Sequence, residues 1–202
     1  MNKIAEIELR RTANILIYFA NSTEFFGKTK ANKLLYYLDC FHLLRYGRTV
    51  LRDKYKKCKL GPVPIETYNR LAVVQELSCM SENDRKEFGS DHELMFEYIE
   101  IITEKINPDI TLERIVPKKD FEPIWFSESE REIMEELAKE FYSTTAAELV
   151  RKTHKESPYK EAKMDDFIDL KLFLKDHNMP QNEITHIAHI EKIIDAMSTN
   201  YQ

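Results

Sequence analysis

Two histidines come closest, by type and spacing, to a metal site in this sequence. His186 and His189 lie three residues apart in a segment with helical periodicity, so both imidazoles could face one ion. A zinc site needs three or four ligands, and no HExxH motif or cysteine pair supplies the others. The three cysteines are odd in number and widely spaced, which predicts reduced thiols. We therefore expect no metal and no cofactor.

The signature motifs of common enzyme classes do not occur in the sequence. It contains no GxxxxGK[ST] or GxGxxG phosphate loop, no GxSxG nucleophile elbow and no HRD catalytic loop. Adjacent carboxylates such as Asp165 and Asp166 would diverge by about 100° on a helix and could not readily share a proton. His154 follows a short helical pattern, where a histidine often satisfies backbone groups. These features predict a protein that is not an enzyme.

The composition is that of one ordinary globular domain. The chain has 202 residues, of which 43% are hydrophobic and 32% charged, so a packed core is expected. Its four glycines and seven prolines are too few for the many tight turns of a barrel or sandwich. The N-terminal segment mixes charges into its apolar pattern, and no apolar run approaches the ~18 residues of a membrane helix. We expect a cytoplasmic protein with no membrane partner.

Charge is distributed unevenly along the chain. Residues 1–70 carry 14 Lys and Arg against 6 Asp and Glu, whereas the remainder is acidic enough to bring the net charge to −5. The basic density peaks over residues 45–59, RYGRTVLRDKYKKCK. Such a stretch can attract nucleic acid or an acidic protein face, or can simply be a solvated loop. Because the chain is acidic overall and has no reading motif, nucleic acid is the less favoured partner.

Hydrophobic periodicity predicts a mainly helical domain. Residues 93–116 differ, because LMFEYIEIIT and ITLERIV are rich in β-branched and aromatic residues and flank the turn sequence NPD. An antiparallel β-hairpin is expected there. The sequence therefore predicts a single domain over 1–202, with about six to eight helices and one inserted hairpin. The main expected helices cover residues 4–21, 28–46, 64–77, 127–141, 145–154, 165–177 and 181–198.

Two segments of the sequence, residues 30–71 and 129–162, carry a family pattern. The first has Lys33 before Leu-Leu-Tyr, a glycine at 47 that ends the helix, and Gly-Pro-Val-Pro at 61–64. The second has Ala147, Glu148, Leu149, Thr153, His154, Pro158 and Ala162, with Tyr159 where tryptophan is usual. Together they resemble the SocA-like Panacea antitoxin domain, with a core match over 28–162. The hairpin is then a variable insertion, and the helix at 181–198 an addition.

The resemblance implies an antitoxin, of the kind encoded by mobile elements and prophages. Such a protein neutralises a cognate toxin, encoded next to it, by direct protein contact. An adaptor that delivers the toxin to a cytosolic protease, or a phage-associated interaction module, are the alternatives. None of these three roles requires a catalytic residue, and none fixes the oligomeric state.

The same motifs suggest which residues bind the partner. Gly61 and Pro62 would fix a rigid turn between two helices and present Lys57, Lys59 and Tyr68 at one edge. The alternative is that the turn only holds the fold and that His154 only closes a helix. Since partners differ across the family, specificity is expected in the hairpin at 93–116, whose edge could pair with a partner strand. The candidate partner-binding residues are Lys33, Tyr37, Lys57, Lys59, Gly61, Pro62, Tyr68 and His154.

Overall fold

The helix α2 (Lys28–Tyr46) runs through the centre of the protein. Of its 19 residues 13 are buried, on all sides of the helix, because α6, α7, α9 and strand β2 surround it. It ends at Gly47, whose φ of +69° is the left-handed conformation that glycine adopts without strain. The predicted helix and its glycine stop are confirmed.

The computed structural model describes residues 3–85, 94–107 and 110–199. Of the residues in these ranges, 60% are helical, which confirms the predicted mainly α class with a β-hairpin. Three of the nine α-helices among the described residues are only four to six residues long. The described elements around α2 are α1 (Lys3–Ser22), α3 (Ile65–Cys79), α4 (Glu82–Arg85), η1 (Pro123–Trp125), α6 (Glu128–Glu140), α7 (Ala146–Thr153), α8 (Ser157–Glu161), α9 (Lys171–Asp176) and α10 (Gln181–Thr199).

Two helices start with the predicted capping boxes. Ser127 accepts from the backbone N–H of Glu130, and the Glu130 carboxylate accepts from the backbone N–H of Ser127. Thr145 and Glu148 repeat the arrangement at the start of α7. Each box satisfies N–H groups that the first turn leaves without a helical partner.

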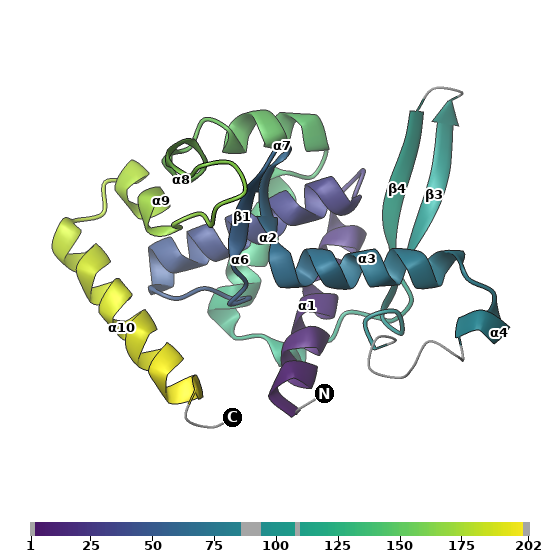
Figure 1. Ribbon diagram of the computed structural model, residues 1–202, viewed down its shortest axis with the longest axis horizontal. Coiled ribbons are helices and arrows are strands. Elements are labelled where there is room, and N and C mark those ends of the chain that lie inside the picture. The colour runs from purple at the N-terminus through teal and green to yellow at the C-terminus, as the bar shows by residue number, and fades with distance from the viewer. Residues whose placement is uncertain (1–2, 86–93, 108–109, 200–202) are drawn as a thin grey trace.

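Two separate antiparallel hairpins lie near opposite ends of α3 (Figure 1). The expected one is formed by β3 (Ile99–Asn107) and β4 (Ile110–Pro117), with Ile101 opposite Ile115. The other was not predicted: β1 (Tyr55–Cys58) pairs with β2 (Gly61–Pro64), with Cys58 opposite Gly61. The Gly-Pro-Val-Pro segment is therefore a strand, and the expectation that it forms a turn between two helices is wrong. Its prolines are tolerated because β2 is an edge strand.

The helix predicted for residues 165–177 is shorter than expected. Only Lys171–Asp176 is helical, and the residues before it run beside β1. The backbone N–H of Ile168 donates to the Tyr55 carbonyl at 2.8 Å, and that of Lys57 donates to the Asp166 carbonyl at 2.9 Å. These bonds to another segment replace the helical ones that the apolar spacing suggested.

Most elements share one hydrophobic core, and α10 is fixed by a smaller one. The main cluster joins α1, α2, α3, the base of β3–β4 and α6. In the smaller cluster, Ile184 and Ile187 of α10 pack on Leu43 and Leu174. None of the described helices combines the length and apolarity needed to cross a membrane.

Candidate functional site

A buried lysine lies where α2 meets the β1–β2 hairpin. The Lys33 side chain is 1% exposed, and its Nζ donates to the Pro62 carbonyl at 2.7 Å. Burial disfavours the charged ammonium and lowers the pKa of Lys33 from 10.5 to about 7. Lys33 therefore connects the central helix to the Gly-Pro-Val-Pro strand.

Gly61 is required by the same junction. Its φ is +98°, and a Cβ placed there would lie 2.6 Å from Lys33 Cε and 2.9 Å from Thr153 Oγ1. Thr153, fully buried at the end of α7, donates back to the Leu149 carbonyl. Any side chain at Gly61 would displace both neighbours, so the strand can pack this closely only with glycine.

His154 closes α7 and stacks on Tyr159. The two rings lie 4.1 Å apart with an interplanar angle of 8°. His154 Nε2 is buried without a hydrogen-bond partner among the described residues. Burial lowers the pKa of His154, and the nearby charges of Lys33 and Lys57 lower it further.

The Lys57 ammonium group also contacts the aromatic ring of Tyr159. Lys57 Nζ lies 4.5 Å from the ring centroid and donates to the Ala162 carbonyl at 2.8 Å. The Tyr159 hydroxyl donates to the Cys58 carbonyl at 3.1 Å. Tyrosine at this position, in place of the usual tryptophan, therefore joins α8 to the β1–β2 hairpin.

A carboxylate that the sequence analysis did not select lies beside this junction. Glu156 accepts from the hydroxyls of Tyr36 at 3.0 Å and Tyr37 at 2.8 Å. Burial raises the pKa of Glu156. The Tyr37 ring stacks on Phe141 at 5.3 Å, so its ring packs in the core while its hydroxyl binds Glu156.

The structure thus brings most of the candidate residues to one place but exposes few of them. Lys33, Tyr37, Gly61 and Pro62 are buried, and His154 is half-buried against Tyr159. Lys59, in the turn between β1 and β2, is exposed, as is Tyr68 on α3, at 45%. Of the eight candidate residues, these two are exposed, and Lys57 and His154 are each partly exposed. The partner-binding role of the eight residues stays a prediction.

The β3–β4 hairpin has a fixed base and an exposed arm. Ile99, Ile101 and Ile115 are buried at its base. The Ile101 N–H donates to Ser78 Oγ, and the Ile115 N–H donates to the Phe26 carbonyl, each at 3.0 Å. Beyond them both strands are largely exposed, and the arm projects from the body (Figure 1). The exposed side chains of the arm are Ile102, Thr103, Glu104, Lys105, Thr111 and Arg114.

The basic stretch 45–59 is partly neutralised by α6. Arg45 forms a bidentate pair with Glu136, at 2.5 and 2.8 Å, and Arg48 pairs with Glu130 at 3.0 Å. These contacts leave fewer free cations for phosphate than the sequence alone suggests. In the part of the chain that the structure describes, no three His, Cys, Asp or Glu side chains are arranged to hold a metal.

A comparison with known protein families finds a match to this chain. The model of the family "Antitoxin SocA-like, Panacea domain" matches residues 32–160, which run from α2 through α8. The match includes the buried junction around Lys33 and Gly61, and the β3–β4 hairpin. Neither a curated protein nor a solved structure matches the chain.

Proposed function

The chain belongs to the SocA-like Panacea antitoxin family, and from this we propose that it neutralises a cognate toxin by binding it directly. The family match over 129 residues carries the proposal. A toxin encoded beside this protein is the expected partner, and the cytoplasm is the expected place of action.

The β3–β4 arm is the proposed specificity element. A two-stranded hairpin leaves backbone N–H and C=O groups along its edges, and a partner strand can hydrogen-bond to them. The anchored base would keep the arm in place, so binding would cost little ordering of the chain. The exposed Ile102 and the Arg114–Glu104 pair, at 3.2 Å, would give the partner an apolar and a charged contact.

The buried junction has a different role in this proposal. Lys33, Gly61 and Thr153 would maintain the scaffold that holds the arm. Family members with different arms could then bind different partners while they keep the same motif.

Co-expression with the neighbouring gene tests the proposal. The neighbour is induced in a bacterial host with and without this protein, growth is followed, and the complex is isolated by pull-down. We expect growth arrest by the neighbour alone, and rescue together with a stoichiometric complex. Rescue must persist in a host that lacks its cytosolic proteases, because rescue only in their presence would indicate an adaptor. A harmless neighbour that forms no complex would contradict the antitoxin assignment.

A further inference from the structure

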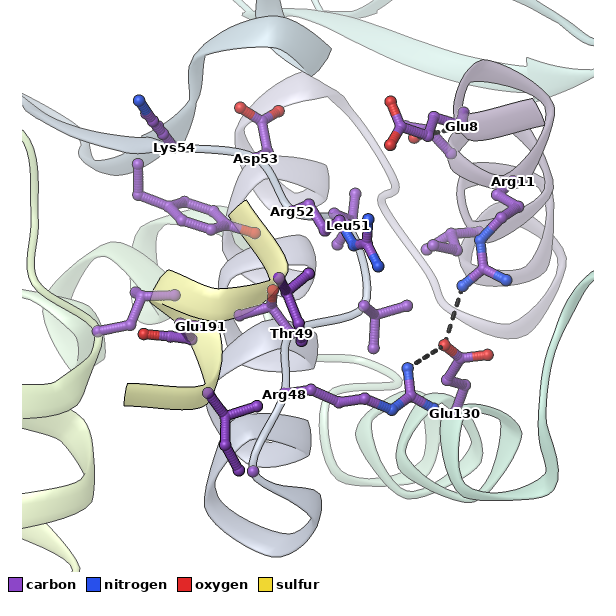
Figure 2. Close-up of a pocket in the computed structure, with 18 of the residues that line it drawn as sticks. Glu8, Arg11, Arg48, Thr49, Leu51, Arg52, Asp53, Lys54, Glu130 and Glu191 are labelled. Atoms are coloured by element: carbon purple, nitrogen blue, oxygen red, sulfur yellow. Dashed lines mark hydrogen bonds and ion pairs between the residues drawn. The ribbon is translucent and has the colours of Figure 1, made fainter. Parts of the chain in front are cut away.

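A second candidate surface is a groove between the first half of α1 and the second half of α10 (Figure 2). Its cavity volume is about 790 Å³, and segment 47–54 forms its floor. Residues 167–171, before and at the start of α9, complete the wall beside α10. None of the residues that line the groove belongs to the β3–β4 arm.

The walls of the groove carry several exposed large apolar side chains. Four of the thirteen exposed large apolar side chains among the described residues line it. They are Ile4, 58% exposed, Ile7, Phe167, 62% exposed, and Ile190. Apolar side chains concentrated in one concave place are typical of a binding surface, whereas scattered ones are ordinary.

The two halves of α10 are held by different contacts, and in the second half Glu191 pairs with Lys171 at 3.5 Å. The first half is fixed by Ile184 and Ile187 in the smaller core cluster. Farther along, Ile190 is 37% exposed and faces the groove. The α1 and α10 helices therefore present apolar faces to one cavity, where a third helix could pack against both.

The charges of the groove favour an occupant that brings carboxylates to its floor. The lining contains five cations and five carboxylates in all, but the floor segment has three cations and only one carboxylate. That carboxylate, Asp53, accepts from the backbone N–H groups of Glu66 and Thr67, at the start of α3. Asp53 therefore caps α3, and its one negative charge leaves the floor, with its three cations, positive.

Among the described residues, none of the three floor cations has a carboxylate of its own. Arg48 shares Glu130 with Arg11, at 3.0 and 2.9 Å, so this trio carries one excess positive charge (Figure 2). Arg52 is exposed and has no ion pair among the described residues, and its φ of +57° is uncommon for a side-chain-bearing residue. An acidic side chain over Arg52 would complement this floor.

From these observations we propose that the groove receives an amphipathic helix of the cognate toxin. The apolar face of that helix packs on Ile4, Ile7 and Ile190, and an acidic residue of the helix pairs with Arg52. This inference rests on the antitoxin function proposed above and adds a second contact to it, at a site outside the β3–β4 arm.

Paired substitutions in the full chain test the groove. The variants Ile190→Asp and Arg52→Glu alter it, and two controls make the same changes elsewhere. Ile124→Asp changes an isoleucine that is 88% exposed in η1, and Arg151→Glu changes an exposed arginine of α7. The affinity for the purified product of the neighbouring gene is measured by calorimetry, and folding is checked by thermal unfolding. We expect each groove variant to weaken binding at least tenfold and each control to change it less than twofold.

A photocrosslinking residue at position 190 then identifies the occupant. We expect it to link to a toxin segment with helical apolar spacing and net negative charge, and the same residue at position 124 to give no link. Replacing the acidic residue of that segment with lysine should restore binding to the Arg52→Glu variant. Groove variants that bind like the controls, or a crosslinked segment that is basic, would overturn the inference and leave the antitoxin function standing. A wild-type protein that does not bind the neighbour would instead refute the antitoxin function, and the inference with it.

Discussion

The two hairpins of this protein are similar in kind but opposite in environment. Every residue of β2 is buried, and side chains of α2 and α8 hydrogen-bond to the β1–β2 hairpin. In β3–β4 only the base is buried, and the arm beyond it is exposed. The family motif lies around the first hairpin, whereas the second is the part that a partner can reach. This contrast supports our proposal that the motif residues maintain the scaffold and that the exposed arm binds the partner.

The largest expected effect is the loss of the buried junction in Gly61→Val. The new side chain would lie within 3 Å of Lys33 Cε and Thr153 Oγ1, at a positive φ that valine does not favour. We expect the free energy of unfolding, measured in urea, to fall by about 3 kcal/mol or more. Gly47→Ala is the matched control, because its φ is also positive but its Cβ would have 3.6 Å of room to Ile187. It should cost only about 1 kcal/mol. Equal losses would show that close packing at Gly61 is unimportant.

Lys33→Met should change how stability depends on pH. The pKa of Lys33 is about 7 in the folded protein and 10.5 ordinarily, so the unfolded chain binds more protons between these values. The contribution of Lys33 to stability therefore rises with pH from about 7 to 10.5, by about 1.4 kcal/mol per unit. Methionine cannot titrate. In urea unfolding, the free energy of unfolding of the wild type should therefore increase relative to that of the variant as the pH rises over this range. Parallel pH curves for the two proteins would contradict the burial of an uncharged lysine.

Ile102→Asp tests the exposed arm. Ile102 is 39% exposed, so the change should alter the free energy of unfolding by less than about 0.5 kcal/mol. Binding to the toxin should weaken about tenfold, because a buried contact would become charged. Its neighbour Ile101, 3% exposed on the opposite face of β3, is the counterpart. Ile101→Asp should destabilise the fold by several times as much. An Ile102→Asp variant with full affinity would remove the arm from the interface.

The smallest expected effect is that of His154→Phe. Phenylalanine keeps the stack on Tyr159 and removes a buried nitrogen that has no hydrogen-bond partner among the described residues. Thermal unfolding should show a change in stability within about 1 kcal/mol in either direction, and calorimetry should show unchanged toxin affinity. Affinity lost without loss of stability would instead mean that His154 contacts the partner.

Much of the helical fold could be predicted because its signals are local. Gly47 ends α2, and Ser127 and Thr145 open their helices through bonds three residues away. The β3–β4 hairpin was also evident, from its β-branched residues. In contrast, β1–β2 has four-residue strands, and the glycine and two prolines in β2 suggest a turn. Its pairing depends on burial against α2, which no local pattern records.

The site was predictable only where the family pattern pointed to it. Lys33, Gly61 and His154 came from the resemblance, and they do lie close together. Their burial was not evident, because a lysine beside an apolar run usually reaches solvent. Glu156 was missed since its partners Tyr36 and Tyr37 lie 120 and 119 residues away in the sequence. Contacts over such separations are set by the packing of whole helices.

Hydrogen–deuterium exchange of the toxin complex is the most direct test of the contrast between the hairpins. Backbone amides of the free protein and of the complex are compared over residues 55–64 and 99–117. We expect binding to slow exchange in the β3–β4 arm and to leave the β1–β2 hairpin, already protected by burial, unchanged. New protection confined to β1–β2, with the arm exchanging as in the free protein, would contradict the account.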